Sequence, residues 1–219
     1  MRSPNHGERR GGATPSLVVL HYTAMQSAEA ASRALCDPAR EVSAHYLISE
    51  AGELWSLVDE ERRAWHAGQG SWRGASDVNS RSIGIELANP GNVPFAAPLM
   101  DRLEELLADI LARWQLPPEA VIGHSDMAPG RKIDPGPRFD WHRLARGGLS
   151  IWPEPDHEAA HVDADKFARD CRAFGWPALD EALQLTTLRL RFRPQAKGPL
   201  DATDCAIAAD LARRFSGDD

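Results

Sequence analysis

Two histidines and an aspartate are the side chains of this sequence best suited to hold a catalytic metal ion. His21 and His124 each directly follow a short apolar run, so each is expected at the end of a buried strand, where open α/β sheets place their ligands. Asp134 follows on a segment stiffened by proline and glycine, and helix capping or turn formation before Pro135 is its alternative role. Catalytic zinc needs three protein ligands and one open position, which these residues could supply.

Two charged residues could carry proton transfer and charge stabilisation beside such a metal. Glu86 interrupts an apolar run, where an unpaired carboxylate costs several kcal/mol, so it needs either a buried partner or a cleft that raises its pKa for proton transfer. Lys132 is one of three lysines among 25 basic residues. Its ammonium could stabilise a tetrahedral oxyanion, and a plain surface lysine is the alternative.

A glycine-, serine- and tryptophan-rich loop supplies the candidates for substrate contact. Loops of this kind between strands are more often binding surfaces than spacers. The candidates on it are His66, Trp65, Trp72, Arg73 and Asn79, and for His66 packing within the loop is an equal alternative. His45 alternates with apolar neighbours in a predicted strand and is equally open to a core role and a functional one. Arg73 or Arg81 could pair with carboxylates of a substrate.

Composition excludes several classes of protein. The chain has 219 residues, 42% of them hydrophobic and 26% charged, as in a soluble globular protein. Its net charge of -7 argues against a nucleic-acid or membrane-surface binder. The sequence contains no apolar run of about 18 residues, which is the length that a membrane span needs. Three cysteines without a pairing motif favour a reducing compartment, so we expect a cytoplasmic protein, or a periplasmic one if an export signal has been removed.

The elements that must position these residues follow from hydrophobic periodicity. Residues 1–15 are predicted to be a loose arm, and the segment 122–136 is too rich in proline and glycine for a helix. Strands are expected at 17–20 and 82–88, and a hairpin at 42–58. Helices are expected at 27–35, 98–116 and 139–144, with a short one starting at 59–63.

The chain changes character after residue 152. Pro153 and Pro155 in an acidic run indicate a linker, and three helical patterns follow at 162–174, 179–192 and 201–215. We therefore predict a catalytic domain over residues 1–152 and a small helical domain over residues 157–219.

Five motifs in order resemble one enzyme family. They are Leu20-His21-Tyr22-Thr23, Ser43-Ala44-His45-Tyr46-Leu47-Ile48, Ala64-Trp65-His66-Ala67-Gly68, Ser82-Ile83-Gly84-Ile85-Glu86-Leu87, and Gly123-His124-Ser125-Asp126 continuing through Lys132-Ile133-Asp134-Pro135-Gly136. Over about residues 15–152 the chain is similar to the zinc-dependent N-acetylmuramoyl-L-alanine amidases of the amidase-2 type, which are related to peptidoglycan recognition proteins and T7-type lysozyme. The tail resembles, more weakly, a small peptidoglycan-binding-like domain.

The resemblance implies an α/β fold with a central mixed β-sheet flanked by helices, plus a small C-terminal three-helix domain. It implies hydrolysis of the amide between N-acetylmuramic acid, expected in its 1,6-anhydro form, and L-alanine of the stem peptide. His21, His124 and Asp134 match the Zn²⁺ ligands, and Glu86 and Lys132 match the catalytic residues of the AmpD/AmiD branch. The expected setting is cell-wall recycling, and the expected partners are muropeptides; the oligomeric state is left open.

Two other functions remain open from the sequence. Some relatives of this type bind peptidoglycan without cleaving it, although here all five matching residues are present. A zinc peptidase acting on the stem peptide itself is the weaker alternative.

Overall fold

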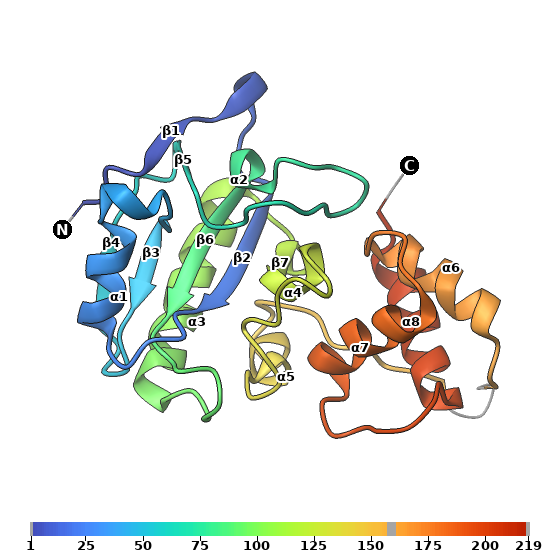
Figure 1. Ribbon diagram of the computed structural model, residues 1–219. Coiled ribbons are helices and arrows are strands. Elements are labelled where there is room, and N and C mark those ends of the chain that lie inside the picture. Colours follow the sequence, from blue (N-terminus) through green and yellow to red (C-terminus); the bar gives the residue numbers. More distant parts are fainter. Residues whose placement is uncertain (1, 157–160, 218–219) are drawn as a thin grey trace.

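A five-stranded mixed sheet forms the centre of the computed structural model, which describes residues 2–156 and 161–217. The strands follow the order β4-β3-β6-β2-β7 (Figure 1). Their bounds are Leu17–Tyr22 for β2, Tyr46–Ile48 for β3, Leu54–Ser56 for β4, Ser82–Leu87 for β6 and Val121–Gly123 for β7. Residues 218–219, 157–160 and Met1 lie outside the description, and with them the predicted start of the second domain at residue 157.

The central strands pair in parallel, and the long connections that parallel strands require contain the helices that cover the sheet. β2 pairs in parallel with β6 and β7, β3 pairs in parallel with β6, and only β3 and β4 form an antiparallel hairpin. Leu17 to Leu20 are buried on both faces of the sheet, which explains the unbroken apolar run of β2. The predicted mixed sheet, its two long strands and the hairpin are confirmed.

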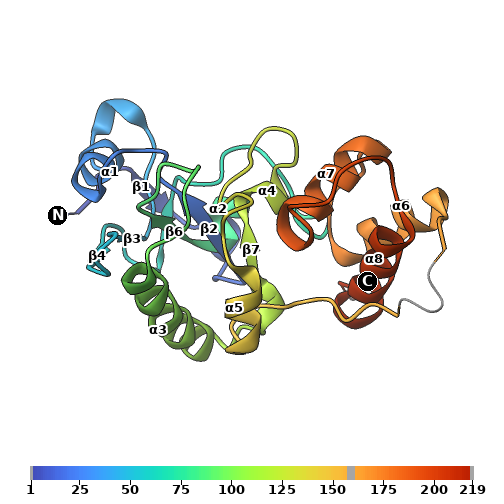
Figure 2. The same ribbon diagram turned by 90° about the horizontal axis from the view of Figure 1, so that it is seen from below.

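Helices pack on both faces of this sheet. α3 (Ala97–Trp114) and α5 (Trp141–Arg146) lie on one face, and α1 (Ala28–Leu35) lies on the other (Figure 2). The buried side chains of α3 recur at helical spacing and form one apolar stripe, as predicted. Two single-turn helices, α2 (Val78–Arg81) and α4 (His124–Met127), lead into or out of the strands. Short 3₁₀ turns occupy Arg10–Gly12, Pro38–Arg40 and Pro118–Ala120.

Three further helices follow the proline-containing segment and form a cluster on the β7 side of the sheet (Figures 1 and 2). They are α6 (Ala164–Phe174), α7 (Glu181–Phe192) and α8 (Ala202–Phe215), and each begins at an aspartate whose side chain caps the helix. One hydrophobic cluster runs from Val19 and Ile122 of the sheet through Trp72 to Phe174 and Leu188. The two predicted domains therefore share a core, and their boundary stays a prediction.

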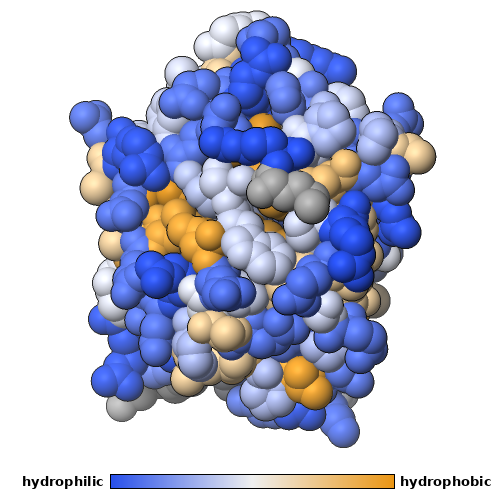
Figure 3. All heavy atoms as spheres, turned by 90° about the vertical axis from the view of Figure 1, so that its left-hand side faces the viewer, coloured by the Kyte–Doolittle hydropathy of each residue, from blue (hydrophilic) through white to orange (hydrophobic). Residues whose placement is uncertain are grey.

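The N-terminal segment and the turn after the hairpin differ from the prediction. Instead of a loose arm and a helix start, β1 (His6–Glu8) pairs antiparallel with β5 (Arg62–Ala64) in a separate two-stranded sheet. Both strands have three residues and carry charged side chains, so neither shows the apolar alternation that identifies a strand in a sequence. Around this side of the molecule the surface is mostly hydrophilic with isolated apolar patches (Figure 3).

The segment 122–136 also differs from its prediction, because its first turn is the helix α4. The prolines and Gly130 of this segment follow that turn and leave it free to form. A carboxylate oxygen of Asp126 accepts a hydrogen bond from the backbone N–H of Gly123 at 2.7 Å, which satisfies one of the unpaired donors at the helix start. Within the described residues no helix has the length and apolarity that crossing a membrane requires.

Candidate metal and catalytic site

The ends of three neighbouring parallel strands bring the candidate residues together. His21 of β2 and Glu86 of β6 are direct register partners. Leu20 pairs with Gly123 of β7, so His124 follows immediately after the end of that strand. Parallel strands end at the same edge of a sheet, and this edge is therefore where residues distant in sequence meet.

His21, His124 and Asp134 form a buried group with three converging ligand atoms. Nδ1 of His21 lies 3.0 Å from Nδ1 of His124, and Oδ2 of Asp134 lies 2.9 Å and 3.0 Å from those two nitrogens. Ligand atoms around a tetrahedral zinc ion with bonds of about 2.0 Å lie roughly 3.3 Å apart. Two imidazole nitrogens and one carboxylate oxygen, set this close and facing one point, fit a catalytic zinc ion and leave one coordination position open.

The second ring nitrogen of each histidine has its own partner, which fixes the orientation of the ring. Nε2 of His124 donates to the carbonyl of Ala67 at 2.9 Å, and the guanidinium of Arg131 donates to the same oxygen at 2.7 Å. Nε2 of His21 lies 3.1 Å from Nδ1 of His66. With Nε2 as the donor in both rings, each Nδ1 presents its lone pair to the metal position.

His66 is held from three sides. Its backbone N–H donates to Oδ1 of Asn79 at 3.0 Å, its Nε2 lies 3.2 Å from Oγ of Ser82, and its ring lies against Gly84 of β6. The N–H of Ala67 donates to the same Asn79 oxygen at 2.8 Å. Asn79 thus fixes the backbone on both sides of the peptide that joins His66 to Ala67, and these two residues are the partners of the two candidate metal-ligand histidines.

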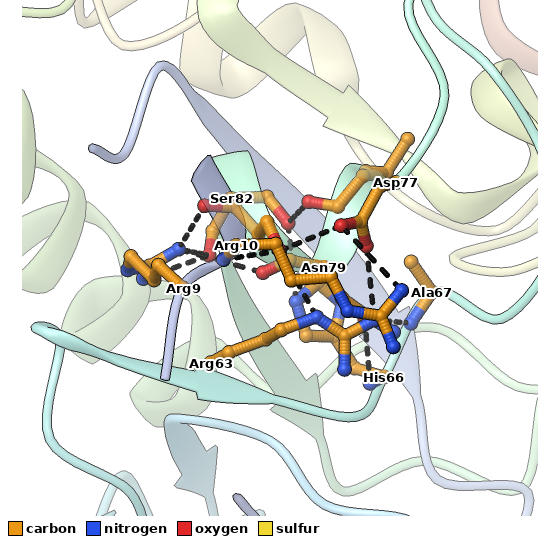
Figure 4. Close-up of polar contacts among 10 residues, drawn as sticks. Arg9, Arg10, Arg63, His66, Ala67, Asp77, Asn79 and Ser82 are labelled. Atoms are coloured by element: carbon orange, nitrogen blue, oxygen red, sulfur yellow. Dashed lines mark hydrogen bonds and ion pairs between the residues drawn. The ribbon is translucent and has the colours of Figure 1, made fainter. Parts of the chain in front are cut away.

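Arginines form hydrogen bonds and ion pairs with the segment that follows His66, as Figure 4 shows. Nη1 of Arg9 donates to the carbonyls of Ser80 and Ser82 at 2.9 Å and 3.1 Å, so the N-terminal segment binds the end of α2 and the start of β6. Burial lowers the pKa of Arg9 to about 10. Arg63 donates to Asp77 at 2.9 Å and to Oγ of Ser80 at 3.0 Å.

His45 belongs to the supporting structure and not to the metal group. Nδ1 of His45 accepts from the backbone N–H of Gly84 at 2.9 Å, so Nε2 carries the proton and donates to the carbonyl of Arg62 at 3.1 Å. The side chain is fully buried, which lowers its pKa to about 4. Between the two uses that the sequence left open for His45, the structure places it in the core.

Burial and mutual charge set the protonation states of the site. Burial and the neighbouring His124 lower the pKa of His21 to about 4, so its imidazole is neutral at pH 7 and able to bind a metal. Burial by itself would raise the pKa of Asp134, but hydrogen bonds from His124 and His21 outweigh it and lower the pKa. Burial and the charge of Asp134 raise the pKa of Glu86 well above its usual value, although Lys132 opposes the shift.

A cleft with a volume of about 590 Å³ opens beside the metal group. His21, His124 and Asp134 lie in its wall together with Glu86 and Lys132, and the predicted substrate contacts Trp65 and His66 also line it. One carboxylate oxygen of Glu86 is buried without a hydrogen-bond partner. Such an oxygen at the wall of a cleft is free to exchange a proton with a bound reactant.

The remaining predicted contacts lie away from this cleft. Trp72 is 1% exposed and its ring packs edge-on against Phe174 of α6, with centroids 5.4 Å apart. The guanidinium of Arg73 donates to the carbonyl of Phe215 at 2.6 Å. Asn79 is buried and holds the His66 backbone. The structure brings none of these three residues to the lining of the cleft.

Several cleft residues carry little or no signal in the sequence. Tyr22, Arg40 and Arg131 line the cleft, and Arg9 supports it from the N-terminal segment. Arg131 is the residue with a usable signal, because it lies between Gly130 and Lys132 in the segment 122–136 that contains three candidate site residues. Arginine is common in this chain, and nothing local distinguishes Arg9 or Arg40 from solvated residues.

Comparisons with known proteins agree with this geometry. Residues 11–137 match the family model described as N-acetylmuramoyl-L-alanine amidase. The chain is 33% identical to N-acetylmuramoyl-L-alanine amidase AmiD of Escherichia coli, over 92% of this chain and 84% of that protein. It is 33% identical to 1,6-anhydro-N-acetylmuramyl-L-alanine amidase AmpD of Enterobacter cloacae, over 65% of this chain and 85% of that protein.

Solved structures give the same result over nearly the whole chain. The structure of AmiD from E. coli in complex with the substrate anhydro-N-acetylmuramic acid-L-Ala-D-γ-Glu-L-Lys superposes with a TM-score of 0.85 at 32% identity, covering 98% of this chain and 99% of that one. AMPDH3 from Pseudomonas aeruginosa in complex with anhydromuramic pentapeptide superposes with a TM-score of 0.83 at 30% identity, covering 99% of this chain and 96% of that one.

Proposed function

The chain belongs to the N-acetylmuramoyl-L-alanine amidase family, and we propose that it is a zinc hydrolase that acts on anhydromuropeptides. The bond it cleaves is the amide between the lactyl group of 1,6-anhydro-N-acetylmuramic acid and L-alanine of the stem peptide. Two relatives with solved structures were captured with anhydromuramyl peptides, which supports this substrate class.

His21, His124 and Asp134 would hold the zinc ion. Their three ligand atoms converge within 4.8 Å of one another, and the neutral imidazole of His21 and the ionised carboxylate of Asp134 are the protonation states that metal binding requires. When bound, zinc supplies a Lewis acid that polarises the scissile carbonyl and lowers the pKa of a water molecule to about 7. The chain's own residues do the remaining work.

Glu86 moves the proton. The pKa of its carboxyl group is raised well above that of a free glutamate. A raised pKa suits a carboxyl group that must both accept and donate a proton at neutral pH. Its unpaired oxygen takes a proton from the attacking water and then delivers it to the nitrogen of the departing alanine.

Lys132 stabilises negative charge on the carbonyl oxygen as the water adds. It lies in the wall of the same cleft and is close enough to Glu86 to oppose the rise in that residue's pKa. An ammonium fixed near the reacting carbonyl favours the tetrahedral oxyanion over the planar ground state. Arg40 and Arg131 add positive charge to the cleft, which suits a stem peptide that carries carboxylates.

The observation that carries this proposal is the meeting of five residues in one cleft: His21, Glu86 and His124 from three strand ends, and Lys132 and Asp134 from the segment after α4. A protein that only binds peptidoglycan needs the groove but has no use for an unpaired glutamate beside a complete ligand group. The geometry therefore favours an enzyme over an inactive binding protein.

Metal analysis combined with product identification tests the proposal. We expect one zinc per chain after purification, and mass spectrometry of a digested anhydromuropeptide should find the free stem peptide with an N-terminal L-alanine. Alanine left attached to the sugar would indicate a peptidase instead. Protein without stoichiometric zinc that leaves muropeptides intact would refute the proposal.

Cytoplasmic recycling of cell-wall fragments is the proposed setting. Cys36, Cys171 and Cys205 are unpaired, which fits a reducing compartment. Fractionation of cells that produce the native protein tests this point, and recovery from the periplasm would contradict it.

A further inference from the structure

A buried charge lies two residues beyond the metal ligand His124. Asp126 is 1% exposed, and its Oδ2 accepts the backbone N–H of Gly123 at 2.7 Å. This contact closes the start of α4, the single turn that contains His124. A carboxylate removed from water in this way requires a partner of opposite charge.

That partner comes from the C-terminal helices. Nη1 of Arg191, in α7, lies 2.7 Å from Oδ2 of Asp126, and the two side chains are 2% and 1% exposed. Nη2 of Arg191 donates to the carbonyl of Val121 at 3.1 Å, and the guanidinium lies over the ring of Trp141 at 4.1 Å. Arg191 therefore binds both the strand that leads to His124 and the helical turn that contains it.

Two further contacts extend this support along the metal-binding segment. Nε1 of Trp176, between α6 and α7, donates to Oδ1 of Asp126 at 3.1 Å. A Cβ atom at Gly130 would lie 3.2 Å from Cδ2 of Leu183, so α7 also packs closely against the later part of the segment. Each oxygen of Asp126 thus has a donor from the C-terminal helices.

The loop of His66 has the same neighbours. The backbone N–H of Arg73 donates to the carbonyl of Gly175 at 2.9 Å, and Trp72 packs on Phe174. Ser71 donates to the carbonyl of Met127 at 2.9 Å and joins this loop to α4. Both segments that orient the metal-ligand histidines therefore lie between the sheet and the C-terminal helices.

We infer that Arg191 is a positioning residue for the metal site, acting through Asp126 and α4 on His124. The inference rests on the proposed function, because the property that it affects is zinc binding. Without the guanidinium, the Asp126 carboxylate must move toward water. His124 lies in the same helical turn, so its Nδ1 would move away from His21 and Asp134. The C-terminal helices are then a working part of the metal site in addition to any affinity they have for cell wall.

Arg189 provides a matched control in the same helix. It is 8% exposed and forms an ion pair with Asp204 at 2.5 Å, and Asp204 is itself fully buried. It also donates to the carbonyls of Gly198 and Pro199 at 2.7 Å and 2.9 Å. All these partners lie in α8 or in the loop that precedes it, so Arg189→Met breaks a buried ion pair without touching the metal-binding segment.

Zinc affinity of the full chain, measured by competition with a fluorescent chelator well below the unfolding temperature, tests the inference. Arg191→Met should weaken zinc binding about 10-fold, as loss of an outer hydrogen-bond partner of a metal site does. Arg189→Met should lower the melting temperature by a similar amount and leave zinc affinity at the wild-type value. Trp176→Phe keeps an aromatic ring, removes the five-membered ring that carries the N–H donor, and should weaken zinc binding in the same direction by a smaller factor.

The outcomes separate this inference from the proposed function. Wild-type protein that binds no zinc overturns both. Wild-type protein that binds zinc, with Arg191→Met binding it equally tightly, overturns the inference alone, and so does an equal loss of affinity in Arg191→Met and Arg189→Met. If Arg191→Met does not fold, Trp176→Phe decides, because unchanged zinc affinity in that variant also overturns the inference.

Discussion

Replacing Gly84 with alanine tests whether the ring of His66 is needed where it lies. A Cβ atom at this position of β6 would lie 2.7 Å from Nδ1 of His66 and closer still to two ring carbons. Contacts between such atoms are normally about 3.5–4.0 Å, so the ring must retreat by roughly 1 Å. It cannot do so freely, because Nδ1 contacts His21 at 3.1 Å and Nε2 contacts Ser82 at 3.2 Å.

The expected cost combines overpacking with the loss of a hydrogen bond. Overpacking of a core costs about 1–3 kcal/mol, and a lost hydrogen bond adds about 1 kcal/mol, so Gly84→Ala should lower the free energy of unfolding by about 2–4 kcal/mol. Since His66 is the partner of His21, a proposed zinc ligand, zinc affinity should also fall about 10- to 100-fold.

Urea unfolding of the zinc-free protein and competitive zinc titration measure the two effects separately. Gly7→Ala is the control, because Gly7 also lies in a strand and a Cβ atom there would have no neighbour within 4 Å. The control should stay within about 1 kcal/mol of wild type. A Gly84→Ala variant that matches Gly7→Ala in stability and zinc affinity would refute the role given to the His66 ring.

Three other changes have equally definite outcomes. Lys132→Ala should lower kcat about 10²- to 10³-fold in a chromatographic muropeptide assay while zinc content stays at one per chain, and an unchanged kcat would remove Lys132 from the mechanism. Asn79→Ala leaves the N–H groups of His66 and Ala67 unpaired and should lower the free energy of unfolding by about 1–3 kcal/mol per group, measured in urea; wild-type stability would contradict its supporting role. Burial alone would raise the pKa of Glu60, but hydrogen bonds led by that from Arg113 outweigh it and lower the pKa. The stabilisation from ionised Glu60 is therefore present above its unfolded pKa of about 4.3 and is lost as pH falls through the lower folded value. Glu60→Gln should flatten the acid side of the profile of unfolding free energy against pH. A profile identical to that of the wild type would contradict this expectation.

The sequence was sufficient to predict the parts of the fold that have long, regular patterns. The apolar run before His21 and the helical stripe from Leu99 to Leu111 each result from burial of one continuous surface, which leaves a clear period in the sequence. The apolar runs before His21 and His124 predicted that both residues lie at strand ends, and the structure brings them to one edge of the sheet beside Glu86.

Other features depend on contacts between distant segments and leave no local pattern. β1 and β5 exist because three residues of each pair with the other, and α4 depends on the capping and burial of Asp126. A tryptophan in a glycine-rich loop suits substrate binding and packing equally well. Only the position of the C-terminal helices shows that Trp72 is packed against Phe174 while Trp65 faces the cleft.

The central claim is that Glu86 transfers protons beside a zinc ion held by His21, His124 and Asp134, and one comparison tests it most directly. Wild-type protein and Glu86→Gln are measured side by side for bound zinc and for turnover of a purified anhydromuropeptide. We predict one zinc per chain in both proteins and a kcat about 10²- to 10⁴-fold lower in the variant, because the amide can neither accept nor return the proton. Wild-type turnover by Glu86→Gln with zinc bound would contradict the claim.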